Sequence, residues 1–121
     1  DLPDDYISNR GGLIYTEAYT QNMAKVRLSP YCSPISADTL SGMPPMLIFI
    51  GGVETLRSSI ERFVEKASAE GVDLEVHLKE GQAHDYALIK EIAGPKLVAE
   101  ADQIIAKFVA QVRNRYLGLS N

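Results

Sequence analysis

One short stretch, MLIFIGG at residues 46–52, constrains the fold more than any other part of the chain. It is an unbroken apolar run without polar alternation, which is typical of a strand covered on both faces, as in a parallel sheet. The run stops at Gly51 and Gly52. Because such a strand needs helices on both faces of its sheet, the sequence predicts an α/β fold.

The segments after this strand alternate between helical and extended patterns. Apolar residues recur at steps of three and four between residues 54 and 71, which predicts an amphipathic helix that stops at Gly71. Residues 72–80 alternate apolar and polar side chains, which predicts a strand near a sheet edge with one wetter face. A short helix within residues 86–92 and a long terminal helix from about Leu97 complete the predicted order.

The first part of the chain is predicted to hold one helix and a long connection. Ser8 can cap a helix through residues 9–23, although Gly11 and Gly12 weaken its start. Residues 28–45 contain four prolines and several serines. These residues deny continuous strand pairing and favour a turn-rich connection.

The predicted strand, helix and strand form a unit that favours a right-handed parallel crossover. Two strands alone cannot build a sheet that is covered on both faces. We therefore expect the unit to lie at the edge of a larger α/β domain, and a small two-layer fold is the alternative.

Composition narrows the function classes. The formal net charge is −4 and 45% of the residues are apolar, so nucleic acid is not an expected partner and no run is long enough to span a bilayer. The single cysteine, Cys32, has no cationic neighbour and is interpreted as a small apolar filler. The composition is that of a soluble domain. Residues 1–10 carry no targeting signal, which slightly favours an intracellular location, but any signal would lie upstream and the localisation stays open.

Two polar residues follow the two predicted strands, Glu54 after the first and His84 after the second. If the strands are adjacent and parallel, both loops open at the same edge, and a carboxylate could meet an imidazole there. A carboxylate on one ring nitrogen fixes the tautomer, so that the other nitrogen can accept and return a proton. The residues alone leave simpler interpretations open: Glu54 as a first-turn helix carboxylate, and His84 as a loop histidine bonded to backbone.

A metal site and a cofactor are not expected. His77 and His84 do not share helical spacing, and no further His or Cys cluster supplies a third or fourth ligand. His77 falls on the polar face of its strand, and we assign it no catalytic role.

Two longer segments, SPISADTLSGMPPMLIFIGGVETL at 33–56 and GVDLEVHLKEGQAHDY at 71–86, carry a family resemblance that extends from about Tyr6 to the end. Their combination resembles the hormone-sensitive-lipase-like branch of the α/β-hydrolases. The resemblance implies the C-terminal part of an α/β-hydrolase fold, with the last parallel strands and flanking helices, incomplete without an N-terminal partner segment. Residues 1–44 would then form a cap-proximal helix and connecting loop, and residues 45–121 the last two strands and their helices.

The resemblance also implies a carboxylic ester hydrolase, an esterase or lipase, that uses a Ser-His-acid triad. Glu54 matches the acid position, where the family more often has Asp, and His84 matches the histidine. Tyr86 would line the substrate pocket, unless it serves packing alone. The G-x-S-x-G elbow and the HGGG-like oxyanion segment are absent from these residues.

The expected partners follow from that absence. They are an N-terminal part of the same hydrolase, carrying the nucleophilic serine, and a small ester substrate. The sequence leaves open whether the protein forms a homo-oligomer. The first helix and its loop would help to shape the acyl or alcohol pocket.

Other functions stay open at this point. A small-molecule-binding protein on the same scaffold would have lost its serine, and an intact His84 argues against it because a receptor needs no base. A stand-alone interaction module would fold cooperatively by itself, whereas part of a hydrolase would expose an apolar strand edge. A peptidase or lactone hydrolase of the same fold is a closer rival.

Overall fold

The computed structural model describes residues 5–21 and 23–119, and its centre is a pair of strands. Strand β1 is Met46–Gly51 and strand β2 is Leu74–Lys79. The two strands pair in parallel along their whole length and form a two-stranded sheet within the described residues. The predicted parallel crossover is therefore confirmed.

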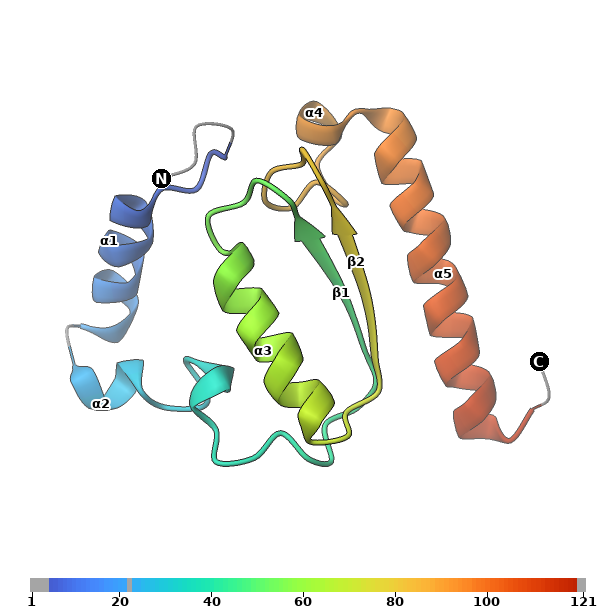
Figure 1. Ribbon diagram of the computed structural model, residues 1–121, viewed down its shortest axis with the longest axis horizontal. Coiled ribbons are helices and arrows are strands. Elements are labelled where there is room, and N and C mark those ends of the chain that lie inside the picture. The colour runs from blue at the N-terminus through green and yellow to red at the C-terminus, as the bar shows by residue number, and fades with distance from the viewer. Residues whose placement is uncertain (1–4, 22, 120–121) are drawn as a thin grey trace.

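Helix α3, Arg57–Ala69, connects the two strands and packs against one face of the pair (Figure 1). It begins three residues later than predicted, because Glu54 N–H donates to Gly51 O at 3.2 Å and closes a turn first. The helix ends as expected, and Gly71 takes a left-handed φ of +78° that suits glycine.

Two helices follow β2. Helix α5, Pro95–Leu117, starts at a proline, two residues before the expected start at about Leu97, and runs beside the strand pair (Figure 1). Helix α4, Lys90–Ala93, is shorter and later than the helix predicted within residues 86–92. The difference arises because Asp85 O accepts the N–H groups of the residues three and four positions on, which closes a turn where the helix was expected.

The amino-terminal part forms a separate layer to the left of α3 in Figure 1. Helix α1, Asn9–Thr20, starts where predicted, with Ser8 Oγ accepting from Gly11 N–H at 3.0 Å. The connection to β1 is long, as expected, but it contains helix α2, Ala24–Arg27, and the 3-10 turn Pro34–Ser36. Neither of these short elements was predicted.

The core consists of two clusters on opposite sides of the strand pair. One joins the loop before β1 to α3 and the start of β2, and its buried members are Leu40, Ala67 and Val72. The other joins the loop after β2 to α5, and its buried members are Tyr86, Ala87 and Ala101.

Strand β2 was expected to have a polar face that is more exposed to solvent than its apolar face. The exposure of three central residues does not follow this expectation. Val76 and Leu78 on the apolar face are 38% and 39% exposed. His77 on the polar face is half-buried, because its ring stacks on Phe49 at 5.5 Å and its Nε2 lies 2.8 Å from Glu75 Oε1. The alternation is present, but packing against Phe49 shields the histidine better than α3 shields the apolar pair.

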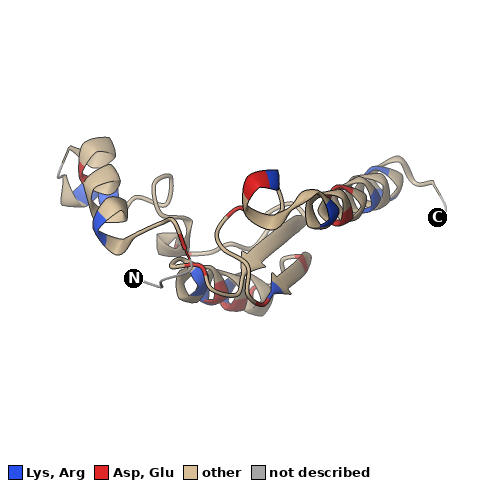
Figure 2. Ribbon diagram, turned by 90° about the horizontal axis from the view of Figure 1, so that it is seen from above, with Lys and Arg blue, Asp and Glu red and all other residues tan. Residues whose placement is uncertain are grey.

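Helices α3 and α5 carry charges of both signs. Acidic and basic residues are interspersed along α3 and α5 (Figure 2). None of the helices in the described part of the chain is both long and apolar enough to cross a membrane.

Glu70, at the end of α3, ties the helix to the loop before β1. Its Oε2 accepts from Thr39 Oγ1 at 2.7 Å and from the backbone N–H groups of Leu40 and Ser41. The hydrogen bond from Thr39, followed by that from Leu40, lowers the pKa of Glu70 below its usual 4.5.

We expect Glu70→Gln to lower stability at neutral pH but not in strong acid. Because the folded-state pKa lies below 4.5, the carboxylate contributes stability above that pH and loses it as the pH falls through the folded value. The urea midpoint of the variant should lie below that of the unchanged protein at neutral pH, and the difference should close as the pH falls below 4.5 and through the folded-state pKa. Glu65→Gln, exposed on the same helix, is the control, and a pH-independent difference for Glu70→Gln would contradict the assignment.

Candidate functional site

The loops that follow β1 and β2 lie against each other at the carboxyl edge of the strand pair. Gly52 N–H donates to Lys79 O at 2.8 Å, and Val53 N–H donates to Gln82 O at 3.0 Å. The first loop carries Glu54. The second loop continues to His84, so the parallel pairing brings these two side chains to one place.

Two glycines permit this close approach. A Cβ atom at Gly51 would collide with the backbone carbonyl oxygens of Ala83 and Gln82. A Cβ atom at Gly52 would collide with the backbone and side chain of Glu80. Any side chain at either position would therefore push the second loop away from the first.

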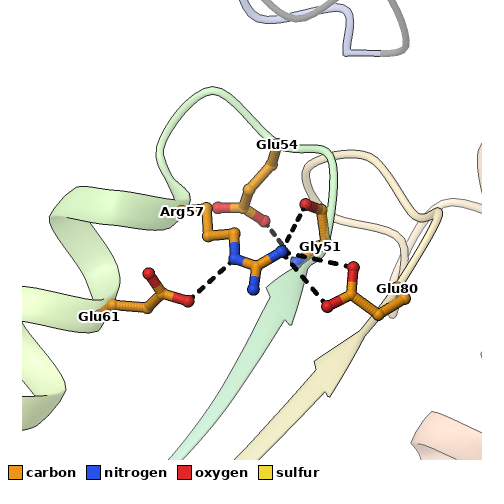
Figure 3. A network of polar contacts seen from close by, with 6 residues as sticks. Gly51, Glu54, Arg57, Glu61 and Glu80 are labelled. Atoms are coloured by element: carbon orange, nitrogen blue, oxygen red, sulfur yellow. Dashed lines mark hydrogen bonds and ion pairs between the residues drawn. The ribbon is translucent and has the colours of Figure 1, made fainter.

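Glu54 is buried, with 2% of its surface exposed. Its Oε2 accepts from Gly51 N–H at 2.7 Å (Figure 3). Its Oε1 lies 3.6 Å from His84 Nδ1. Neither Oε1 nor Nδ1 has a hydrogen-bond partner within residues 5–21 and 23–119, so each of these buried atoms faces the other.

The second ring nitrogen of His84 lies on a more open side. Nε2 is 3.5 Å from Oδ1 of Asp85, and the His84 side chain is 25% exposed. The ring of Tyr6 lies 6.1 Å from that of His84, centroid to centroid. Asp85 has a φ of +56°, a left-handed conformation that aspartate tolerates better than most residues.

This geometry excludes one of the simpler interpretations that the sequence left open. Glu54 lies in the turn before α3, which begins at Arg57, so it is not a first-turn helix carboxylate. One ring nitrogen of His84 lies within 4 Å of the Glu54 carboxylate, and the other lies within 4 Å of the Asp85 carboxylate. The ring therefore lies between two acidic side chains.

Arg57 joins the same two loops through a network of polar contacts (Figure 3). Its Nη1 donates to Gly52 O at 2.9 Å and lies 3.3 Å from the carboxylate of Glu80. Its Nε donates to Glu61 Oε1 at 2.9 Å. The hydrogen bond to Glu61, with the charge of Glu80, raises the pKa of Arg57 above its usual value and keeps the guanidinium charged.

A cavity of about 210 Å³ opens beside the pair and is lined by Phe49, Glu54, Ile60, His84, Asp85, Tyr86, Ala87 and Leu88. Tyr86 is 5% exposed, and its ring meets Phe49 edge-on. Burial, with a smaller effect of the Glu54 charge, raises the pKa of Tyr86. Tyr86 therefore both packs in the core and forms a wall of this cavity.

Asp5 and Tyr6 also lie against this site, although no role was predicted for either residue. Asp5 Oδ1 accepts from His84 N–H at 3.2 Å, and its Oδ2 accepts from Thr55 N–H at 2.7 Å. Burial alone would raise the pKa of Asp5, but the hydrogen bonds from the Thr55 and His84 backbone outweigh it and lower the pKa. Burial, then the charges of Asp85 and Asp5, raises the pKa of Tyr6.

No local signal could have found these two residues. Asp5 is 79 positions from His84 in the sequence, and neither it nor Tyr6 belongs to a motif. The part of the chain that the structure describes contains no group of three or more His, Cys, Asp or Glu side chains that could hold a metal ion.

A parallel crossover whose two loops bring a buried carboxylate to a histidine is an α/β arrangement found in hydrolases. The family model of the α/β hydrolase fold matches residues 2–88, more than half of the chain. The chain therefore belongs to the α/β-hydrolase family, which confirms the predicted fold class and the resemblance to its hormone-sensitive-lipase-like branch. No curated protein is significantly similar to the chain.

Solved structures similar to this chain include esterases. A thermostable esterase from Pseudomonas putida ECU1011 is 28% identical with a TM-score of 0.71, over 81% of this chain and 31% of its own. An esterase from Pyrobaculum calidifontis is 28% identical with a TM-score of 0.55, over 73% of this chain and 29% of its own. DphMB1, 23% identical with a TM-score of 0.65 over 78% of this chain and 32% of its own, supports the fold alone.

The chain thus spans about a third of the length of these structures, 31% in the case of the Pseudomonas esterase. Its family and its esterase neighbours define it as an esterase-like α/β-hydrolase chain.

We expect Gly51→Ala to separate the two loops. The added Cβ would meet backbone that cannot give way, and such overpacking costs roughly 1–3 kcal/mol. Urea unfolding measures this loss. The control is Gly12→Ala in α1, where a Cβ meets nothing within 4 Å and should stabilise the helix by about 0.5–1 kcal/mol. Equal effects of the two substitutions would show that the contact at Gly51 does not limit the approach of the loops.

Proposed function

We propose that this chain supplies the acid and the histidine of a Ser-His-acid triad in a carboxylic ester hydrolase. The observation that carries the proposal is the pair of buried, otherwise unpartnered atoms, Glu54 Oε1 and His84 Nδ1, which face each other at 3.6 Å. A buried carboxylate without full hydrogen bonding is costly. A functional reason for this cost is stabilisation of the positive charge that an imidazole gains when it takes a proton.

The roles follow from the two sides of the imidazole. Glu54 would hold Nδ1 and so fix the tautomer and the orientation of the ring. Nε2 of His84, on the more open side, would take the proton from a serine hydroxyl as the serine oxygen attacks the ester carbonyl. His84 would then return this proton to the leaving alcohol, and water would repeat the sequence on the acyl-enzyme to release the acid.

The serine and the oxyanion donors would come from an amino-terminal part of the same hydrolase. Support for this partner comes from the esterase neighbours, of whose length this chain spans about a third, 31% for the Pseudomonas enzyme. Support also comes from an apolar hollow of about 430 Å³ beside β1, whose lining includes Ile48, Ile60 and Phe63. Such a surface suits coverage by further elements of an α/β domain.

A small ester is the proposed substrate. The cavity beside His84 has a volume of about 210 Å³, and Ile60, Tyr86 and Leu88 contribute apolar surface to its wall. In this proposal Tyr86 contacts the substrate with its ring. Residues 1–44 would form the cap-proximal segment, and residues 45–121 would carry the acid and the histidine.

The first test replaces the histidine in the intact protein that contains this chain. We expect His84→Ala to reduce kcat on a short p-nitrophenyl ester by about 10⁴-fold or more, because the base is lost. His77→Ala is the matched control and should be nearly silent, since His77 stacks on Phe49 and is not among the residues that line the cavity beside His84. Turnover that survives in His84→Ala, or disappears in His77→Ala, would overturn the proposal.

The second test replaces the acid while keeping its shape. Glu54→Gln retains an oxygen for Gly51 N–H but removes the charge and offers an N–H₂ group, which favours the wrong tautomer of His84. We expect kcat to fall by roughly 10²–10⁴-fold while some turnover remains. Glu61→Gln, on α3 and partnered with Arg57, controls for the general loss of a carboxylate. A Glu54→Gln enzyme as active as the control would exclude Glu54 as the triad acid.

A further inference from the structure

The segment from Asp5 to Ile7 binds to both loops of the site at once. Asp5 accepts one hydrogen bond from each loop: Thr55 N–H at 2.7 Å and His84 N–H at 3.2 Å. The Thr55 hydroxyl donates in return to Ile7 O at 2.6 Å. The segment is therefore fixed at three points, and all three involve the backbone or side chain of the residues that carry or adjoin the Glu54–His84 pair.

The position of these bonds matters because of the residues that donate them. Thr55 directly follows Glu54 in the chain, and the other donor is the backbone of His84 itself. The carboxylate of Asp5 thus links the main chain beside the acid to the main chain of the base. Its two oxygens hold these two backbones beside each other.

The other links between the loops lie elsewhere in them. Gly52 and Val53 bond to Lys79 and Gln82, and Arg57 bonds to Gly52 and Glu80. These contacts hold the start of each loop. The hydrogen bonds of Asp5, by contrast, are made at Thr55, which adjoins Glu54, and at His84 itself.

We propose that Asp5 is a positioning residue that sets the separation between Glu54 and His84. It touches no reacting atom and acts through the backbones of Thr55 and His84. Its effect on turnover rests on the proposed function, whereas its effect on the two backbone amides does not.

The charge of Asp5 is part of this role. A carboxylate accepts on both oxygens, and hydrogen bonds to a charged acceptor are the stronger kind. Asparagine has almost the same shape but offers one accepting oxygen and one donating N–H₂ group. In Asp5→Asn one of the two backbone N–H groups would therefore face another donor, so one link would break while the fold is otherwise preserved.

The experiment compares Asp5→Asn with the unchanged intact protein and with Asp102→Asn, an exposed aspartate on α5. We expect kcat on a short p-nitrophenyl ester to fall by about 10- to 100-fold while KM changes less than about twofold, since misplaced catalytic groups slow the chemical step more than binding. The amide hydrogens of Thr55 and His84 should exchange about tenfold faster or more. Asp102→Asn should change none of these quantities.

A second variant covers the case in which Asp5→Asn unfolds the segment. Thr55→Val removes the hydroxyl that holds Ile7 O but keeps the backbone N–H, so it loosens the segment without placing two donors together. We expect a smaller loss of kcat in the same direction and faster exchange of the His84 amide. Thr55→Ser keeps the hydroxyl and should restore both.

The outcomes separate this inference from the proposed function. If the unchanged protein hydrolyses esters and His84→Ala does not, but Asp5→Asn matches Asp102→Asn in kcat and in amide exchange, then the inference is wrong and the function stands. If ester turnover is absent or survives in His84→Ala, the function is wrong, and the exchange of the Thr55 and His84 amides still decides whether Asp5 holds the two loops.

Discussion

The parallel pairing of β1 with β2 is the constraint on which the rest of the structure depends. Because the strands run in the same direction and in register from end to end, the loops that leave them emerge at one edge. An antiparallel pair would send the two loops to opposite ends, and Glu54 would lie a strand length away from His84. The crossover helix α3 makes the parallel pairing possible, and it also places Arg57 where it can bond to both loops.

The site also requires the two loops to approach each other closely, and this approach depends on the absence of side chains at Gly51 and Gly52. At Gly51 and Gly52 the space that a Cβ would occupy is filled by the backbone of the other loop. The same approach excludes water from Glu54, which is 2% exposed. A carboxylate in such a place interacts more strongly with a neighbouring charge than it would in water. The glycines therefore contribute to the electrostatics of the site as well as to its shape.

Much of this arrangement could be predicted from the sequence, because the decisive signals are local. The run of apolar residues at 46–52, the helical spacing up to Gly71 and the polar residues directly after each strand indicated the crossover and the meeting of its loops. What could not be predicted depends on tertiary contacts. The shielding of His77 results from its stacking on Phe49, and Asp5 reaches His84 across 79 positions.

The glutamate side chain is long enough for its carboxylate to accept a hydrogen bond from Gly51 N–H and also to lie close to His84 Nδ1. Glu54 lies three residues after Gly51, and its Oε2 bends back to accept the N–H at the end of β1 at 2.7 Å. This bond fixes the carboxylate plane and leaves Oε1 directed toward His84 Nδ1 at 3.6 Å. An aspartate is shorter by one methylene group, so with the backbone unchanged its carboxylate would lie closer to the turn before α3. That turn is held on its other side by Asp5, through the N–H of Thr55. Asp5 thus bonds to the turn that carries Glu54, and the glutamate side chain extends from this turn to His84.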